Sequence, residues 1–172
     1  MMDRIFNINE KLKKLKNIQE CEILLEKPSD EEILDLKALK DFPPDMLQIL
    51  TEIGCMKKWS VRNCGLLLWW VPDSISNSMA KDRCIYDVLE INFRNSSNLL
   101  FFASDASGQL YFYNTENSPW TIEICDGLGP DPDSKQKYWI TYKDDSHPDF
   151  LSIIEEFTNF EFEKLERSKG MA

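Results

Sequence analysis

The order of its hydrophobic patterns is the feature that most constrains the fold of this chain. Apolar residues recur at three- and four-residue steps, the period of an amphipathic helix, in residues 3–20 and 41–54, on either side of a short capped helix expected at about 30–40. Short β-favouring runs follow, and helical spacing returns only in residues 147–165. This order predicts an α+β fold, a single domain with a mostly antiparallel central sheet and helices packed on one face.

The first predicted helix, over residues 3–20, has an apolar stripe on one face and lysines on the other. The stripe consists of Ile5, Ile8, Leu12, Leu15 and Ile18, and the polar face carries Lys11, Lys13, Lys14 and Lys16. A basic helix can lie on a membrane or dock a partner, but we interpret these lysines as the solvated face of a packed helix.

Local signals define the ends of the other helices. Ser29 followed by Glu32 is typical of a capping box, in which each side chain bonds the backbone amide of the other residue. Pro44 suits the first turn of the next helix and Gly54 its C-terminal end. The expected apolar faces are Met46, Leu47, Leu50 and Ile53 in that helix, and Phe150, Ile153, Ile154, Phe157 and Phe160 in the closing helix, with Asp149 in its first turn.

The strand-like segments are GLLLWWVPDSI, YDVLEINF, SNLLFFASDASGQLYFYN, PWTIEIC and YWITYK. The third, residues 97–114, places a small polar turn between two apolar runs, which predicts a hairpin. Asp105 and Ser107 can bond neighbouring amides there, and Gly108 can adopt positive φ where the chain reverses. Because both strands carry apolar residues on both faces, we expect the hairpin to be central and covered on both sides.

Two catalytic interpretations of the same turn are weaker. Ser107 with His147 and an aspartate could form a hydrolase triad, but the turn lacks the Gly-x-Ser-x-Gly pattern and leads into a strand, not a helix. A phosphate-binding loop needs several glycines and a lysine before a helix, and this turn has one glycine and no lysine. We therefore expect no catalytic residues and no enzymatic activity.

The cysteines indicate neither a disulfide framework nor a metal site. They are Cys21, Cys55, Cys64, Cys84 and Cys125. Their number is odd, no pair has the two-residue spacing of a zinc knuckle, and His147 is the only histidine. We expect reduced, mostly buried thiols, with no metal and no cofactor.

Negative charge is concentrated in one stretch of the chain. Residues 105–166 contain fourteen acids and four bases, so they account for the whole net charge of −10. Such a region repels nucleic acid and anionic membranes and attracts basic partners. The alternative is that the acids only keep the protein soluble.

The hairpin and the segments around it resemble the SUKH superfamily. FFASDASGQLYFYN is similar to the central hairpin of that family, in which an Asp-x-x-Gly turn, here Asp105 and Gly108, joins two strands. PSDEEILDLKAL, FPPDMLQILTEIG, GLLLWWVPDSI and HPDFLSIIEEF resemble its entry helix, its Leu-Pro helix, its strand before a proline-aspartate turn and its closing helix. In the second of these, Phe42 stands where the family usually has Leu. The resemblance covers about 28–158 and leaves the helix at 3–20 as an addition.

The resemblance implies a non-enzymatic protein-binding module. Many bacterial members are immunity proteins that bind and neutralise a toxin, often a nuclease, whereas relatives of the yeast cell-wall assembly regulator act as regulatory adaptors. An acidic inhibitor would complement the basic cleft of a nuclease. The candidate contacts are Asp126, Asp131, Asp133, Asp144 and Asp145, with Trp120, Tyr138 and Trp139 as aromatic anchors. Solvated loop aspartates and core aromatics are the alternatives for these residues.

The expected compartment is the cytosol. The first seventeen residues lack the apolar segment of a secretory signal, and the longest strongly apolar run, Gly65 to Val71, is far shorter than the roughly 20 residues of a membrane helix. The sequence does not define the oligomeric state.

Overall fold

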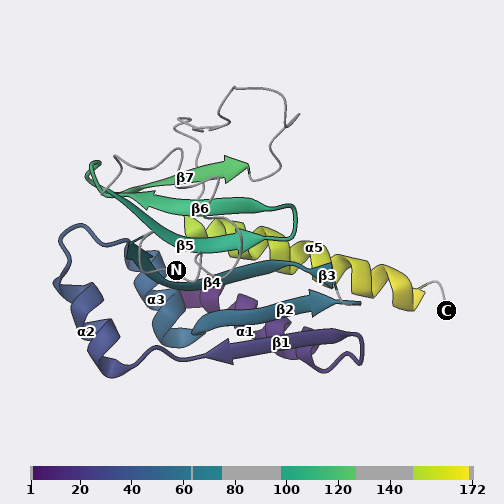
Figure 1. The fold of residues 1–172 in the computed structure, drawn as a ribbon. Coiled ribbons are helices and arrows are strands. Elements are labelled where there is room, and N and C mark those ends of the chain that lie inside the picture. The colour runs from purple at the N-terminus through teal and green to yellow at the C-terminus, as the bar shows by residue number, and fades with distance from the viewer. Residues whose placement is uncertain (1, 63, 75–97, 127–148, 171–172) are drawn as a thin grey trace, which may run out of the picture. The chain divides into compact units, whose positions relative to one another are not determined.

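The computed structural model describes residues 2–62, 64–74, 98–126 and 149–170. Within these ranges the elements are α1 (Met2–Lys16), β1 (Cys21–Glu26), α2 (Asp30–Ala38), α3 (Pro44–Glu52), β2 (Cys55–Val61), β3 (Cys64–Gly65), β4 (Leu67–Ser74), β5 (Leu99–Asp105), β6 (Gln109–Asn114), β7 (Thr121–Asp126) and α5 (Phe150–Gly170). The strands form a sheet in the order β1-β2-β4-β5-β6-β7, with β3 paired to β2, and each described register is antiparallel. The predicted α+β fold is confirmed (Figure 1).

The chain divides into two compact units, and β4 runs from the first into the second. The first unit, Met1–Trp70 with Pro148–Ala172, contains the described helices, β1 to β3 and the start of β4. The second unit, Val71–His147, contains the end of β4 and the strands β5 to β7. That the whole chain is one domain stays a prediction.

In the first unit, α1 packs against β1 and α5 with the apolar stripe predicted from the sequence. Ile5, Ile8, Leu12 and Leu15 are all buried. The helix ends at Lys16, however, and Ile18 lies in the turn before β1, where its carbonyl accepts from the amide of Cys21 at 3.0 Å. The strand β1 was not expected from the sequence.

The capping box at the start of α2 is present. The Ser29 hydroxyl accepts from the amide of Glu32 at 3.2 Å, and the Glu32 carboxylate accepts from the amide of Ser29 at 2.7 Å. Helix α2 is otherwise lightly packed, because Leu36 is its one buried residue. Its helical conformation therefore depends strongly on these local bonds.

Helix α3 differs from the prediction in its buried face. Met46, Leu50 and Ile53 are buried as expected, but Ile49 completes the face where Leu47 was predicted. The spacing alone allowed both positions, and the packing inside the first unit selects Ile49.

Gly54 follows this helix with a φ of 105°. Its carbonyl accepts the indole N–H of the buried Trp69 at 2.7 Å, which joins the end of α3 to β4.

In α5 the predicted apolar stripe is correct for three of its five residues. Phe150, Ile153 and Ile154 are buried, whereas Phe157 is only partly covered and Phe160 is 57% exposed. The expectation for Phe160 is wrong, because the buried stripe continues instead through Thr158 and Glu161. The Lys164 ammonium lies 4.2 Å from the centroid of the Phe160 ring, so a cation covers this exposed aromatic ring.

The second unit contains the predicted hairpin. Its strands, β5 and β6, pair in antiparallel register from Leu99 opposite Asn114 to Ser104 opposite Leu110, with a bulge between Phe101 and Ala103. β7 adds to the other side of β6. Consecutive residues are buried in both strands, from Phe101 to Ser104 and from Leu110 to Tyr113, as expected for a hairpin covered on both faces. The predicted strands YDVLEINF and YWITYK lie outside the described residues.

Candidate functional site

The turn between β5 and β6 is organised by the Asp105 carboxylate. Its Oδ1 accepts from the Ser107 amide at 2.9 Å, the Ser107 hydroxyl at 2.6 Å and the Gln109 amide at 3.0 Å, while Oδ2 accepts from the Tyr111 hydroxyl at 2.8 Å. The Gly108 amide donates to the Asp105 carbonyl at 3.2 Å, which closes the β-turn, and Gly108 has a φ of 90°. Through these bonds the Asp105 side chain fixes the conformation of the turn.

Ser107 is part of the same turn. Its hydroxyl and its backbone amide both donate to the Asp105 carboxylate, which is the bonding pattern of a side chain that stabilises a reversal. His147, the other candidate of the hydrolase interpretation, lies outside the described residues.

Aromatic rings pack across the hairpin and reach one predicted anchor residue. Phe102 stacks on Tyr113 with a centroid distance of 4.1 Å, and Phe101 lies 5.2 Å from Phe112, its partner across the strands. Trp120, predicted as a partner-binding aromatic, is half-buried just before β7, with its ring centroid 6.2 Å from that of Tyr113. Trp120 therefore contacts the core residue Tyr113 and is also partly exposed to solvent.

Most of the predicted partner-binding residues fall outside the described part of the chain. Asp126 is the last residue of β7 and lies opposite Gln109 of β6, which fixes its backbone position. The residues outside the described ranges are Asp131, Asp133, Tyr138, Trp139, Asp144 and Asp145.

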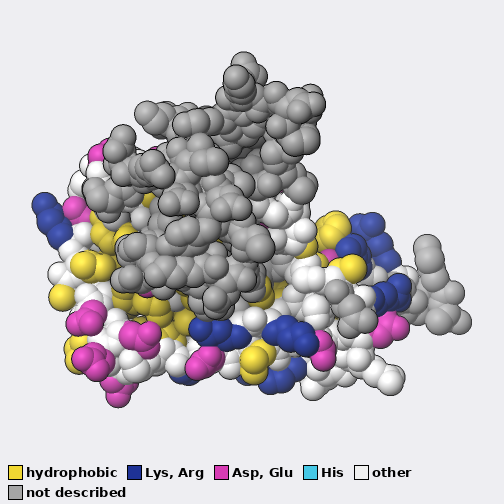
Figure 2. Space-filling model, viewed as in Figure 1, with side chains coloured by type: hydrophobic (Ala, Val, Ile, Leu, Met, Phe, Trp, Pro, Cys, Tyr) yellow, Lys and Arg dark blue, Asp and Glu magenta, His cyan; other side chains and the backbone are white. Residues whose placement is uncertain are grey.

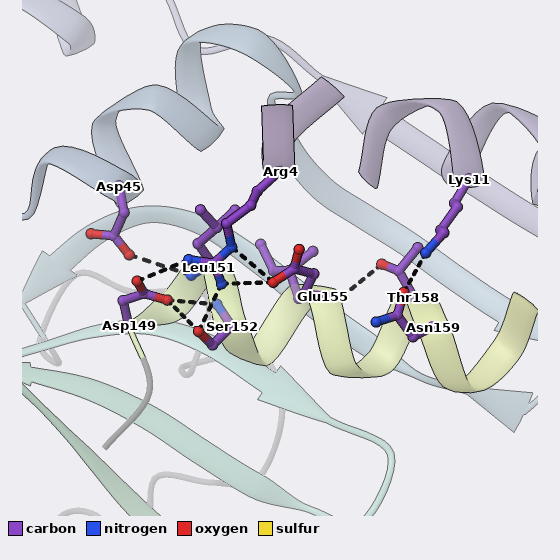
Figure 3. Close-up of polar contacts among 10 residues, drawn as sticks. Arg4, Lys11, Asp45, Asp149, Leu151, Ser152, Glu155, Thr158 and Asn159 are labelled. Carbon is purple, nitrogen blue, oxygen red and sulfur yellow. Dashed lines mark hydrogen bonds and ion pairs between the residues drawn. The ribbon is translucent and has the colours of Figure 1, made fainter. Parts of the chain in front are cut away.

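A polar cluster that sequence reasoning missed joins α1, α3 and α5 in the first unit (Figure 3). The guanidinium of Arg4 donates to Glu155 Oε2 from Nε at 2.9 Å and from Nη2 at 2.7 Å, to the Ser152 hydroxyl at 2.8 Å, and to Asp149 Oδ2 at 3.3 Å. These bonds raise the pKa of Arg4 further, the Glu155 hydrogen bonds most of all. We call Arg4, Asp45, Asp149, Ser152 and Glu155 the Arg4 cluster.

Asp149 and Asp45 cap the start of α5 from two directions. Asp149 Oδ1 accepts from the Ser152 amide at 2.7 Å and from the Ser152 hydroxyl at 2.6 Å. Asp45, which is buried on α3, accepts from the Leu151 amide at 3.3 Å. Both carboxylates lie at the positive end of the helix dipole, where negative charge is favourable.

The two capping carboxylates have pKa shifts in opposite directions. Burial raises the pKa of Asp45, and the backbone hydrogen bonds that it accepts only partly offset this effect. Burial also acts to raise the pKa of Asp149, but hydrogen bonds from Ser152 and the nearby charge of Arg4 prevail, so its pKa lies below its ordinary value.

Two further contacts continue the joint between α1 and α5. Lys11 donates to Asn159 at 2.5 Å, and the ammonium groups of Lys11 and Lys14 lie 5.9 and 5.5 Å from the centroid of the Phe162 ring. Residues further along α1 contact residues further along α5, so the two helices run in the same direction. Two of the four predicted solvated lysines therefore take part in helix packing.

Three cysteines in the described part of the chain are free thiols. Cys21 and Cys55 are buried free thiols, Cys64 is exposed, and burial raises the pKa of Cys21. Among the residues that the structure describes, no three His, Cys, Asp or Glu side chains are grouped as a metal ion would need. Likewise, none of the described helices combines the length and apolar character that crossing a bilayer requires.

Comparisons of the chain with protein-family models, with curated proteins and with solved structures found no match.

Proposed function

We propose that this protein is a non-enzymatic binding module that holds and neutralises a basic protein, in the manner of a SUKH-type immunity protein acting on a nuclease toxin. The observation that carries the proposal is the charge distribution, since residues 105–166 account for the whole net charge of −10. The resemblance described for residues 28–158 supports the same assignment.

The physical basis is electrostatic complementarity. A nuclease must bind a polyanion, so its active cleft is basic, and carboxylates can replace phosphates as partners of Arg and Lys. A concentrated negative region also speeds the encounter with such a cleft. The proposed contacts are Asp126, Asp131, Asp133, Asp144 and Asp145, with Trp120, Tyr138 and Trp139 as aromatic anchors.

The test measures binding to a basic toxin domain taken from the reading frame next to this gene and purified as a catalytically inactive variant. A neighbouring frame that encodes no such domain would favour the regulatory adaptor. Replacing Asp131, Asp133, Asp144 and Asp145 by Asn removes charge and keeps shape. The sequence predicts that these carboxylates are exposed to solvent, where charges contribute little to stability, so the variant should fold. We expect weaker binding, a slower association rate and a smaller dependence of that rate on salt.

A matched control removes four acids from the first unit instead: Asp3→Asn, Glu10→Gln, Asp41→Asn and Glu52→Gln, all outside residues 105–166. This variant has the same net charge as the first and should keep most of the affinity. Equal losses in the two variants would indicate that overall charge, and not this region, attracts the partner. A wild-type protein that does not bind the domain would refute the proposed function, and a regulatory adaptor of the same fold would then be the better assignment.

A further inference from the structure

Helix α2 exposes apolar side chains that the described part of the first unit leaves uncovered. Leu36 is the buried anchor of this helix, whereas Leu34 is 65% exposed and Leu39, at its C-cap, is 44% exposed. Single exposed leucines are common on protein surfaces. Leu34 and the C-cap residue Leu39 are about 140° apart around the helix axis, so they are two separate apolar contacts with the acids Glu31 and Asp35 between them.

The acids around these leucines lack basic partners within the described ranges. Asp30, Glu31 and Asp35 are exposed, and none forms an ion pair or a side-chain hydrogen bond with another residue that the structure describes. Glu32 is occupied by the capping box, and Lys37 is the only base within α2.

The neighbouring strands show the opposite arrangement. Around β1 and β2, the exposed acids are matched to bases by the pairs Arg62–Glu20, Lys58–Glu22 and Lys57–Glu26. Uncompensated negative charge in this part of the first unit therefore lies next to exposed leucines on α2. Figure 2 shows acidic and hydrophobic side chains next to each other at the position that α2 has in Figure 1.

The helix presents Leu34 and the acids Asp30, Glu31 and Asp35 on the side away from the buried Leu36, and Leu39 follows at its C-cap. Asp30, Leu34 and Ala38 are four residues apart, so they lie in a row along one side of the helix, and Glu31 lies next to Leu34 in the adjacent row. The capping box fixes the start of the helix, and Leu36 holds it to the unit from another side. A partner that binds this face does not have to order it first, which lowers the entropic cost of association.

We infer that the outer face of α2 is a docking surface for a basic amphipathic segment of the partner protein. Apolar side chains of that segment cover Leu34 and Leu39, and its Lys or Arg side chains pair with Asp30, Glu31 and Asp35. The charge of the face excludes nucleic acid and anionic lipid as occupants. This inference rests on the proposed function and adds to it a second contact surface outside residues 105–166.

The experiment titrates the purified, catalytically inactive toxin domain into the full-length protein and two α2 variants. In the first variant, Leu34→Gln with Leu39→Gln removes the apolar contacts, and Gln keeps good helix propensity. In the second, Asp30→Asn, Glu31→Gln and Asp35→Asn remove the charges. Leu24→Gln is the matched control, because Leu24 is an equally large, 55% exposed leucine that lies on β1 and not on α2.

We expect the leucine variant to lose about tenfold or more in affinity. The acid variant should associate more slowly and show a smaller salt dependence, whereas the control should stay within about twofold of the wild type. Helicity measured by circular dichroism verifies that each variant is folded. If the wild type binds and both α2 variants bind equally well, the α2 surface is refuted while the proposed function stands. If the wild type itself does not bind, the proposed function fails and this inference fails with it.

Discussion

At the scale of single residues, Gly54 occupies a position where an added side-chain carbon has no room. A Cβ built there would lie 2.7 Å from the carbonyl oxygen of Glu26, and the φ of 105° is unfavourable for any other residue. We expect Gly54→Ala to lower the free energy of unfolding by at least the roughly 1–3 kcal/mol typical of backbone strain. Gly65→Ala is the control, because a Cβ added there would meet no atom within 4 Å. This variant should lose much less free energy of unfolding than Gly54→Ala. Urea denaturation of both variants checks this, and equal stabilities would contradict it.

The turn residues Gly108 and Asp105 give a second prediction at this scale. Gly108→Val should destabilise the protein by roughly 1–3 kcal/mol, because valine disfavours the observed φ of 90°. Asp105→Ala should also destabilise it, since two backbone amides and the Ser107 hydroxyl lose their acceptor and the Tyr111 hydroxyl loses the nearer of its two acceptors. Ser107→Ala removes one of these donors and should cost less than Asp105→Ala. Thermal melts of the variants test whether Asp105→Ala destabilises the protein more than Ser107→Ala does. An unchanged melting temperature of Gly108→Val would refute the requirement for glycine at this turn position.

Asp45 predicts a pH dependence with a defined sign. Its pKa is raised in the folded state, so the folded protein binds this proton more tightly than the unfolded chain does. The stabilising contribution of Asp45 is therefore complete below 3.8, its ordinary pKa, and is lost as pH rises through the raised pKa. Asp45→Asn should remove this loss, because its amide oxygen can still accept from Leu151. Urea unfolding at several pH values should show that the free energy of unfolding of the variant increases relative to that of the wild type as pH rises.

Asp149 supplies the opposite comparison. Its pKa is lowered in the folded state, so its stabilising contribution is present above the ordinary value of 3.8 and is lost as pH falls through the lowered pKa. The free energy of unfolding of Asp149→Asn should therefore fall relative to that of the wild type as pH rises from below the lowered pKa to the ordinary value of 3.8. Identical pH profiles for the two variants would contradict both assignments.

At the scale of elements, the Arg4 cluster holds α1 to α5. Arg4 and Glu155 are both partly covered, and two guanidinium nitrogens bond one carboxylate oxygen. We expect a double-mutant cycle with Arg4→Gln and Glu155→Gln to give a coupling energy of about 1 kcal/mol. The pair Arg167–Glu163 within α5 is the control, because both of its side chains are largely exposed and its coupling should be smaller. Equal couplings would show that Arg4 adds no specific link between the helices.

The elements that the sequence predicted well are those with local signals. The capping box at Ser29, the glycine after α3 and the Asp105–Gly108 turn each depend on residues within a few positions of one another. The strand β1 was missed because it has only six residues, includes adjacent leucines and begins soon after a helix. Its clearest sequence signal is the alternation of Cys21, Glu22 and Ile23.

The candidate site residues were harder to predict for a related physical reason. The bonds from Arg4 to Glu155 join residues 151 positions apart, and the burial of Asp45 depends on α5 packing over α3. No short-range pattern contains that information. Phe160 was expected inside because its spacing fits the stripe, but the buried row runs from Phe150 and Ile154 to Thr158 and Glu161, which leaves Phe160 exposed at its edge.

At the scale of the whole molecule, β4 is shared by the two compact units. Because this strand continues without interruption from one unit into the other, we expect a single cooperative unfolding transition. Gly54→Ala in the first unit should then shift the unfolding of β5 and β6 in the second unit by as much as it shifts that of α3. Amide hydrogen exchange in increasing denaturant, followed at Tyr111 and Ile49, measures both. Separate transitions would show that the units are independent domains.

The pairing of α1 with α5 also determines when this protein can finish folding during its synthesis. Arg4 leaves the ribosome first, but its partner Glu155 is made 151 residues later, which takes roughly 8–30 s at ordinary rates of translation. Until then, α1 can pack on β1 but not on its second neighbour, and the apolar side of the unfinished first unit stays open to other chains. The nascent protein is therefore most exposed to aggregation just before α5 emerges.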